Sequence, residues 1–424
     1  MVETEEKVKQ FILIAIETGR GPLPAETSLS ELAQLLETAG GQEAGRLIQP
    51  LDQPVSKTYF GKGKLEELKD LVEETKADGV IADDELSPAQ LKNIGDYLGC
   101  QVLDRTSLIL EIFAARAKTR EGQLQVEMAQ LKYRLSRLSG VGASMSRQGG
   151  GAGLHVRGAG ETKLELDRRN IRSRIAALRT QLDEIEGQRE IQRGRRQKSK
   201  IPMVALVGYT NAGKSTIFNR LTEAGVLEED QLFATLDTTT RRIELPSGRQ
   251  VVLADTVGFI QNLPHHLVEA FHATLEEVAY ADLLVHVVDA SDEKASNNMK
   301  VTMDAMSRLH AGDKPIITVF NKSDLPGSDQ VEGPKYVSEK VLHISAFDSK
   351  DVARLTQAIE EALDRQARIG MLLIPYTEGG LSSRLYDMGT VMNEEYREDG
   401  ICYTIQLKAE DWKRLEKYKI DETL

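Results

Sequence analysis

The sequence of 424 residues predicts an α/β protein made of four parts in succession. Apolar runs typical of strands alternate with helical stretches near the N-terminus and again in the second half of the chain. Two long stripes of apolar residues with helical spacing lie between these regions. We therefore expect an N-terminal α/β domain at 1–115, a helical hairpin of the coiled-coil type at 116–198, a central α/β domain at 199–366 and a small C-terminal α+β domain at 367–424.

Strand and helix signals alternate at both ends of the chain. The N-terminal part predicts strands at 9–16 and 79–82 and helices at 29–37, with a serine at its start, 65–72 and 108–116. The C-terminal part predicts strands at 371–375 and 401–407 and helices at 382–395 and 412–418. The run Gly61-Lys62-Gly63-Lys64 before a helix can bind an anion, but a simple loop is the interpretation that we prefer.

A glycine-rich segment between a strand and a helix is the most specific motif in the chain. Residues 208–215 fit the pattern G-x-x-x-x-G-K-[ST], after an apolar run at 203–207 and before a helical stretch at 216–221. The glycines let the backbone wrap closely around phosphate, Lys214 can reach the β- and γ-phosphates, and the Ser215 hydroxyl can bind Mg²⁺. The residues expected to bind the phosphates are Gly208, Tyr209, Thr210, Asn211, Ala212, Gly213, Lys214, Ser215 and Thr216.

A second motif identifies the base of the nucleotide. The pattern N-K-x-D follows the apolar run at 316–320, and its aspartate, Asp324, can accept two hydrogen bonds from guanine. Adenine would leave that carboxylate unpaired. The Asn321 amide can hold the loops together, and backbone N–H groups near 345 can complete the pocket. The residues expected around guanine are Asn321, Lys322, Ser323, Asp324, Ser345, Ala346 and Phe347. The sequence therefore predicts a P-loop GTPase domain that binds GTP and GDP.

Two further segments of the nucleotide site lie between these motifs. Asp255 can hold Mg²⁺ through water, and the Gly258 N–H can sense the γ-phosphate. A threonine hydroxyl in the first switch should complete the Mg²⁺ shell, and the residues alone leave the choice among four threonines (235 and 238–240) open. The two segments are Asp255, Thr256, Val257 and Gly258, and, as the first switch, Phe233, Ala234, Thr235, Leu236 and Asp237.

One position departs from Ras-like enzymes, which place a water-orienting glutamine directly after this glycine. Here the residue is Phe259, which cannot hydrogen-bond water. We therefore expect slow intrinsic hydrolysis, with the positioning group supplied by another residue or by a partner. The histidines downstream, His265, His266 and His272, are interpreted as ordinary surface or packing residues rather than as bases.

The composition indicates a protein of a reducing compartment. No run of 18 or more apolar residues is present, so no stable membrane insertion is expected. The N-terminus is acidic and lacks the pattern of a signal peptide. Cys100 and Cys402 lie far apart and are interpreted as free thiols. We expect a cytoplasmic protein, with partial association with a membrane surface left open, and a monomer rather than an oligomer.

Positive charge is concentrated in one part of this acidic chain. The net charge is −12, yet the segment from Lys132 to Lys200 holds 17 Lys and Arg against 7 Asp and Glu. Such a segment can bind a polyanion, or it can be the solvated face of an arginine-rich helix, and composition does not decide between the two.

The pattern within the basic segment predicts two helices joined by a glycine-rich tip. The apolar stripes are Leu124, Met128, Leu131, Leu135 and Leu138, and Ile171, Ile175, Leu178, Leu182 and Ile185. Between them, 147–160 is too rich in glycine to be helical, and it carries Arg147, His155 and Arg157. The helix after the tip carries Arg168, Arg169, Arg172 and Arg174. No strand precedes the tip, so we reject a second nucleotide loop there. We expect the tip to be the functional part of the hairpin.

The whole chain, from about residue 10, resembles the HflX-type translational GTPases. The resemblance is carried by the nucleotide motifs and by three blocks outside them, at 104–110, 121–127 and 158–169. It implies binding to ribosomal RNA of the large ribosomal subunit, with splitting or rescue of stalled ribosomes and stimulation of hydrolysis by the ribosome. It also implies that Thr235 is the Mg²⁺ threonine. Ser215 and Thr235 are then the metal ligands, and Lys214, Thr235 and Gly258 act in hydrolysis. Thr238 stands where many family members have proline.

Two other functions remain compatible with the sequence. The protein could be a GTPase that acts on another RNA or at a membrane surface, and binding to ribosomes would distinguish this function from the first. It could also be a GTP-gated binding module whose hydrolysis is incidental. No feature of the sequence indicates binding to DNA.

Overall fold

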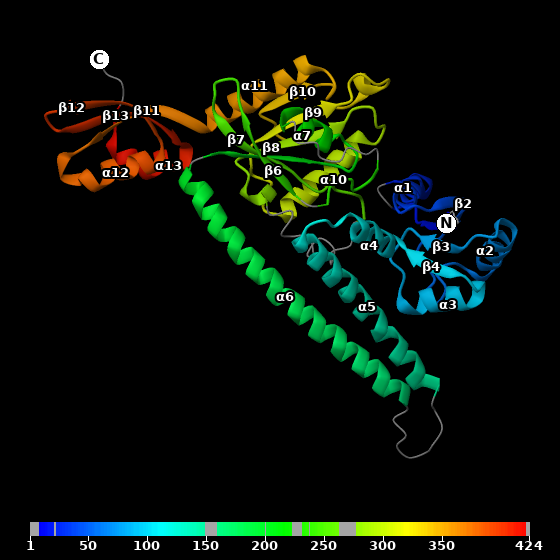
Figure 1. The fold of residues 1–424 in the computed structure, drawn as a ribbon. Coiled ribbons are helices and arrows are strands. Elements are labelled where there is room, and N and C mark those ends of the chain that lie inside the picture. The colour runs from blue at the N-terminus through cyan, green and yellow to red at the C-terminus, as the bar shows by residue number, and fades with distance from the viewer. Residues whose placement is uncertain are drawn as a thin grey trace, which may run out of the picture.

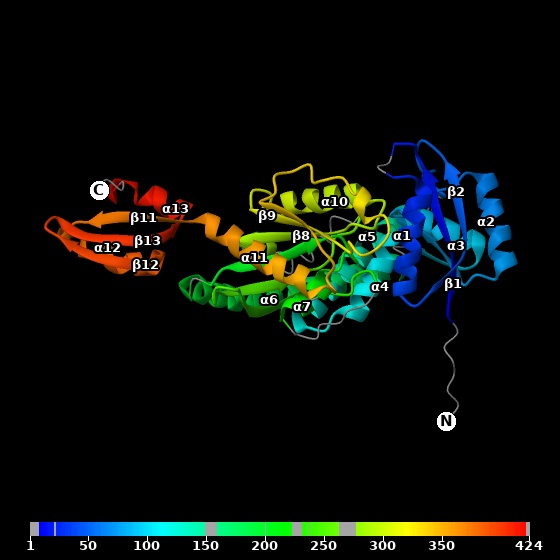
Figure 2. The same cartoon turned by 90° about the horizontal axis from the view of Figure 1, so that it is seen from above.

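The structure, a computed structural model, describes residues 8–20, 23–148, 159–199, 201–222, 231–236, 238–262 and 277–420. In this described part the predicted α/β architecture is present, with three sheets and a long helical hairpin (Figure 1). The N-terminal and C-terminal sheets lie on opposite sides of the central sheet (Figures 1 and 2). The residue limits of the four domains stay predictions.

Four parallel strands form the N-terminal sheet, in the order β2-β1-β3-β4. Its elements are β1 (Gln10–Glu17), α1 (Ala25–Thr38), β2 (Gln42–Pro50), α2 (Lys62–Thr75), β3 (Gly79–Ala82), α3 (Pro88–Leu98), β4 (Gln101–Asp104) and α4 (Arg105–Arg116). Every strand and helix predicted for this region is present. The sequence did not predict β2, α3 and β4. Strand β2 lies at the sheet edge, and its mixture of polar and apolar residues shows no strand pattern.

The predicted serine start of helix α1 is wrong, because another part of the chain caps this helix. The helix begins at Ala25 after Pro24, which makes no side-chain capping bond. The Ala25 N–H instead donates to Glu17 Oε2 at 2.7 Å, so the end of β1 supplies the cap. Helix α2 begins directly after Gly61, whose N–H donates to Gln49 Oε1 at 3.0 Å. This bond favours the simple loop over an anion site in the run at 61–64.

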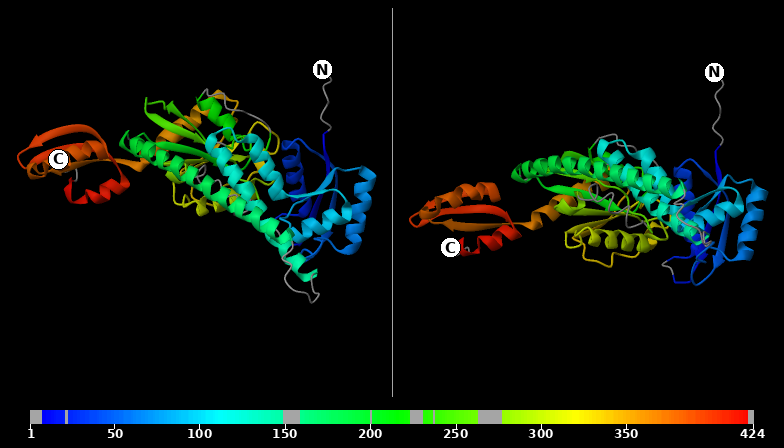
Figure 3. Two further views of the ribbon diagram at one scale, coloured as in Figure 1. Left: turned by 60° about the horizontal axis from the view of Figure 1, so that its bottom comes forward. Right: turned by 90° about the horizontal axis from the view of Figure 1, so that it is seen from below.

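Helices α5 (Arg120–Gln148) and α6 (Ala159–Ser199) form the predicted hairpin. They run side by side with their connection at the end distant from the central sheet (Figures 1 and 3). Leu124 of the first stripe and Ile171 and Leu178 of the second are buried. The tip at 149–158, with His155 and Arg157, lies outside the described residues, as does the side chain of Arg147.

Several arginines of the hairpin bind partners within it. Arg174 forms a bidentate ion pair with Glu127, at 2.7 and 2.9 Å, and Arg189 forms an ion pair with Glu121 at 2.8 Å. Arg168 donates to the backbone carbonyl of Leu138 at 2.9 Å. Part of the predicted positive surplus is therefore neutralised inside the hairpin, whereas Arg169 and Arg172 are exposed to solvent.

The central sheet has the strand order β10-β9-β8-β5-β7-β6, with only β6 antiparallel to its neighbour. Its elements are β5 (Met203–Gly208), α7 (Lys214–Thr222), β6 (Thr239–Glu244), β7 (Gln250–Asp255), β8 (Leu283–Asp289), α10 (Ala295–Arg308), β9 (Ile316–Asn321), β10 (Lys340–His343) and α11 (Ser349–Gln366). Helices α7 and α11 cover one face and α10 the other (Figure 2). The carboxyl ends of the parallel strands therefore meet at one edge, where ligands bind in such folds.

The C-terminal sheet is antiparallel, in the order β12-β13-β11-β14. Its elements are β11 (Ala367–Ile374), α12 (Gly379–Met388), β12 (Thr390–Arg397), β13 (Gly400–Lys408), α13 (Ala409–Arg414) and β14 (Lys419–Ile420). The predicted helix at 382–395 is wrong in its second half, because residues from Thr390 onward pair with β13. The predicted helix at 412–418 ends at Arg414 and continues as a short 3₁₀ turn. None of the helices in the described part of the chain has the length and hydropathy that crossing a membrane requires.

A buried histidine predicts how the stability of the central domain depends on pH. His286 in β8 is 1% exposed, and its Nδ1 lies 2.6 Å from Tyr336 Oη. Burial, helped by the positive charge of Lys214, lowers the pKa of His286 to about 3. Between that value and about 6.5 the unfolded chain binds a proton that the folded chain does not. Stability is therefore full above about pH 6.5 and falls below it, by at most about 1.4 kcal/mol per pH unit.

The calorimetric Tm of the wild-type protein should fall between pH 7.5 and 5.5. We expect a smaller fall in His286→Gln, which has no imidazole to protonate. His343→Gln, which changes an exposed histidine of β10, is the matched control and should retain the whole fall. Equal falls in wild type and His286→Gln would show that protonation of His286 is not responsible.

Candidate nucleotide site

The phosphate loop leaves β5 at Gly208 and enters α7 at Lys214, as the sequence predicts. Gly208 has a φ of +154°, and a Cβ there would lie 2.2 Å from the carbonyl oxygen of Val287. Gly213 has a φ of +90°, and a Cβ there would lie 2.2 Å from Asn321 Nδ2. Both positions therefore require glycine, because a side chain would clash and the backbone is in a region that favours glycine. The loop packs directly on β8 and on the base-recognition segment.

Three oxygen-bearing side chains from three motifs converge beside the loop. Ser215 Oγ lies 2.8 Å from Asp255 Oδ2 and 2.7 Å from Thr235 Oγ1. Thr235 Oγ1 donates to the same Asp255 oxygen at 3.0 Å. The other Asp255 oxygen, Oδ1, is buried and has no hydrogen-bond partner among the residues that the structure describes. Hydroxyl and carboxylate oxygens at this spacing fit a hard cation such as Mg²⁺.

The same geometry distinguishes Thr235 from two of the other three candidate threonines. Thr235 lies against Ser215 and Asp255, whereas Thr239 and Thr240 lie in β6 and pair with β7. This arrangement favours Thr235 as the threonine of the Mg²⁺ site.

Lys214 is buried between the phosphate loop and Gly258. Its Nζ donates to the carbonyl of Tyr209 at 2.8 Å, and a Cβ added at Gly258 would lie 3.0 Å from it. Burial lowers the pKa of Lys214 to about 8, against the opposing effect of the Asp255 carboxylate. Lys214 and Gly258 thus face the same space, which suits binding of the terminal phosphate.

Asn321 connects the loops around the predicted base pocket. Its Nδ2 donates to the carbonyl of Ala212 at 2.9 Å, and its Oδ1 accepts from the Ala346 N–H at 3.1 Å. The Ser345 N–H donates to Asp351 Oδ2 at 2.9 Å. In this structure the N–H groups of residues 345 and 346 therefore hold the loops together rather than face the cavity.

The side chains expected to touch guanine surround this Asn321 connection. Lys322 forms an ion pair with Asp289 at 2.7 Å, which holds its stem beside the pocket. Phe347 is 69% exposed, with the guanidinium of Arg220 5.4 Å from its ring centroid. Asp324 is exposed beside them, where a ligand could reach its carboxylate.

A cavity of about 370 Å³ joins the phosphate and base motifs. Of the predicted residues it is lined by Thr210, Asn211, Gly213, Lys214, Ser215, Thr216, Phe233, Ala234, Thr235, Thr256, Gly258, Asn321, Lys322, Asp324, Ala346 and Phe347. Gly208, Tyr209, Ala212, Leu236, Asp255, Val257, Ser323 and Ser345 lie outside its lining. Asp237 is outside the described residues. Gln231 and Leu325 also line the cavity. The sequence motifs did not indicate these two residues, because Leu325 directly follows the base motif and Gln231 lies two residues before the first switch.

Phe259 does not face the cavity. It is 4% exposed and belongs to the core on the α10 face of the central sheet. Its backbone bonds to the phosphate loop on both sides, donating to Gly208 O at 3.1 Å and accepting from Thr210 N–H at 2.8 Å. The residue therefore holds the segment after Gly258 against the loop and leaves the site without a glutamine at this position. His265, His266 and His272 lie outside the described residues.

Three family models match successive segments of the chain. The first is described as a GTP-binding GTPase N-terminal region and matches 26–114. The second is a GTP-binding GTPase middle region and matches 116–196. The third is a 50S ribosome-binding GTPase and matches 203–322.

Two solved structures of GTP-binding proteins resemble the chain at low similarity. The SsGBP–GDP complex is 25% identical and has a TM-score of 0.47, covering 84% of this chain and 98% of its own. A GTP-binding protein from Sulfolobus solfataricus in complex with GDP is 24% identical, with a TM-score of 0.44 and coverage of 84% and 99%. These TM-scores are too low to support a structural argument.

Curated relatives named GTPase HflX match nearly the whole chain. The protein of Caldanaerobacter subterraneus subsp. tengcongensis is 48% identical over 420 residues, 99% of this chain and 96% of its own. That of Lacrimispora saccharolytica is 46% identical over 410 residues, covering 97% and 96%. The Escherichia coli protein is 43% identical over 393 residues, 91% of each chain. With this similarity, and with the GTP motifs meeting in one cavity, the chain belongs to the HflX family of GTPases.

Proposed function

We propose that this GTPase binds the large ribosomal subunit through its hairpin, is stimulated there, and splits or rescues stalled ribosomes. The observation that carries the proposal is the hairpin itself, a basic antiparallel pair of helices projecting away from the GTP site (Figure 3). Folded ribosomal RNA is a polyanion that such a tip can approach through its phosphates. The match of 203–322 to a model described as a 50S ribosome-binding GTPase supports the same partner.

We assign the roles in the GTP site from the contacts around it. Ser215 and Thr235 hold Mg²⁺, and Asp255 fixes both hydroxyls through one carboxylate oxygen. When bound, Mg²⁺ neutralises charge on the phosphates. Lys214 would bind the terminal phosphates, and the Gly258 N–H would be available to the γ-phosphate. A partner supplies or positions the group that orients water, because Phe259 is buried in the core.

The two cysteines bear on the compartment in which the protein works. Cys100 and Cys402 are free, as expected of a reducing compartment such as the cytoplasm. We propose a cytoplasmic monomer that meets the ribosome as a single chain. Sedimentation of the protein alone gives its oligomeric state.

Removing the phosphate contacts should stop hydrolysis and leave the fold intact. We expect Lys214→Ala and Ser215→Ala to abolish Mg²⁺-dependent turnover, because the first loses the phosphate charge partner and the second a metal ligand. Phosphate release measures turnover, and circular dichroism should match wild type. Lys300→Ala, which changes an exposed lysine of α10, is the control and should keep full activity. Wild-type turnover in either site variant would show that the cavity is not the active site.

Asp324→Asn should reduce selectivity for guanine. The amide keeps the shape of the carboxylate and loses one acceptor, and a charge-assisted hydrogen bond contributes about 1.5–3 kcal/mol. GTP affinity should fall by about tenfold or more, and the xanthine nucleotide should gain relative to GTP. Asp329→Asn, at an exposed position that does not line the cavity, should bind GTP as wild type does. If Asp324→Asn binds GTP unchanged, another residue recognises the base.

The hairpin tip should be needed for action on ribosomes but not for GTP binding. We expect hydrolysis by the isolated protein to be slow and the large subunit to stimulate it, as measured by single-turnover rates. Shortening the loop between Arg147 and Arg157 should remove binding and stimulation and spare GTP affinity, because other residues form the cavity.

Salt and a matched substitution extend this test. Cosedimentation with large subunits should weaken steeply with salt. Arg174→Gln is the control, because Glu127 already pairs with that arginine. If a shortened variant still binds and splits ribosomes, the hairpin has only a structural role. Cosedimentation with other RNA but not with ribosomes would favour the alternative function.

A further inference from the structure

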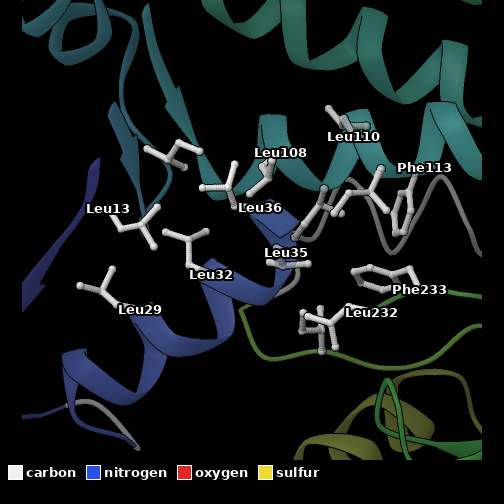
Figure 4. Packing of buried hydrophobic residues seen from close by; sticks show 14 of the residues in the cluster. Leu13, Leu29, Leu32, Leu35, Leu36, Leu108, Leu110, Phe113, Leu232 and Phe233 are labelled. Atoms are coloured by element: carbon white, nitrogen blue, oxygen red, sulfur yellow. The ribbon is translucent and has the colours of Figure 1, made fainter. Parts of the chain in front are cut away.

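Both switch segments of the GTP site pack into the core of the N-terminal domain. Phe233 and Leu236 of the first switch with the preceding Leu232, and Val257 and Ile260 around Gly258, which we call the second switch, belong to one hydrophobic cluster with residues of α1, α4 and α5. Figure 4 shows Leu232 and Phe233 beside Phe113 of α4 and the leucines of α1. Phe233 and Phe113 meet edge to face, with ring centroids 4.7 Å apart and an interplanar angle of 79°.

A polar network reaches the segment after Gly258 from the same side. Tyr209 belongs to the phosphate loop, but its hydroxyl accepts from the Gln261 N–H at 2.8 Å and donates to Glu31 of α1. Arg105 pairs with Glu31 and with Asp83 at 2.7 Å, and it donates to the Gln261 carbonyl at 3.3 Å. Burial raises the pKa of the Tyr209 hydroxyl, so it keeps its proton. Both backbone groups of Gln261 are thus bound by this network.

The residue before Arg105 holds helix α5 of the hairpin. Asp104 is fully buried and accepts from the N–H groups of Leu86, at 3.1 Å, and Ser107, at 2.9 Å. It also accepts from the Tyr133 hydroxyl and the Arg137 guanidinium of α5. Asp104 and Arg105 are adjacent residues at the junction between β4 and α4. Arg105 therefore contacts the segment after Gly258, and Asp104 contacts the hairpin, from the same point in the fold.

We propose that Glu31, Arg105 and Phe113 are positioning residues that couple the nucleotide-dependent position of the switches to helix α5 of the hairpin. They act through Tyr209, Gln261 and Phe233 and touch no nucleotide. Arg105 is buried between two carboxylates, so losing one partner would leave an uncompensated buried charge. When Gln261 is displaced, Arg105 therefore moves with it and keeps its hydrogen bond to the Gln261 carbonyl. Because Asp104 is adjacent in the chain, α5 moves with it. The coupling requires the GTPase site but not a ribosome.

Hydrogen exchange of the isolated full-length protein tests this coupling. We compare exchange with GDP and with a non-hydrolysable GTP analogue in peptides covering 120–137, the part of α5 that ends at Arg137. In wild type the exchange rates should differ between the two nucleotides by at least about twofold. Glu31→Gln, which keeps an acceptor for Tyr209 but loses the ion pair with Arg105, should reduce that difference by at least about half. Phe113→Leu, which loses the edge-to-face contact with Phe233, should do the same.

Two matched variants separate coupling from simple destabilisation. Glu26→Gln changes a carboxylate on the same helix that pairs with Arg46, and Phe60→Leu changes a buried phenylalanine in a different core. Both should retain the wild-type difference, because loosening alone raises exchange equally in both nucleotides. The proposal fails if wild type shows no nucleotide-dependent difference at 120–137, or if Glu31→Gln and Phe113→Leu keep it in full. Such a result leaves the proposed ribosome function untouched, because no ribosome is present.

Discussion

One hydrophobic core joins the N-terminal domain, helix α5 of the hairpin and loops of the candidate nucleotide site. Its members include Leu35 of α1, Phe113 of α4 and Ala129 of α5, together with Phe233 and Ile260 from the two switch segments. A fully buried side chain as large as leucine or phenylalanine contributes about 1.5–3 kcal/mol. Loops of the candidate nucleotide site are therefore stabilised by residues of the N-terminal domain and the hairpin.

The buried charges at the same interface have a different role from the apolar contacts. Apolar burial is not directional, so the core alone permits small rotations of one domain on the other. Arg105 requires Glu31 and Asp83 at fixed positions, and its bond to the Gln261 carbonyl orients the segment after Gly258. Buried ion pairs add little to stability, because desolvation offsets their attraction. We interpret this one as selecting a single orientation of the domains.

The arginines of the hairpin also have two different roles, since some form ion pairs within the protein and others are exposed. Some arginines are used inside the protein, as Arg137 binds Asp104 and Arg174 binds Glu127. Others on α6, such as Arg169 and Arg172, are exposed, and the sequence places further basic residues in the tip. Internal ion pairs therefore neutralise part of the hairpin's charge, and the exposed arginines keep charge that a polyanion can reach.

The α/β class and the hairpin could be predicted from the sequence alone, and so could most of the residues that line the candidate GTP site. Phosphate and guanine chemistry restrict residue type over short stretches, so Gly213, Lys214 and Asp324 are recognisable from their immediate neighbours. Features that depend on distant residues became visible only in the folded chain. Glu17 caps α1, pairing with β13 makes 390–397 a strand, and the contacts of Ser215 and Asp255 favour Thr235 among four threonines. The network from Tyr209 through Glu31 to Arg105 belongs to the same class, since its residues are far apart in the chain. Local patterns report local preferences, whereas these contacts exist only after the chain has brought separate segments together.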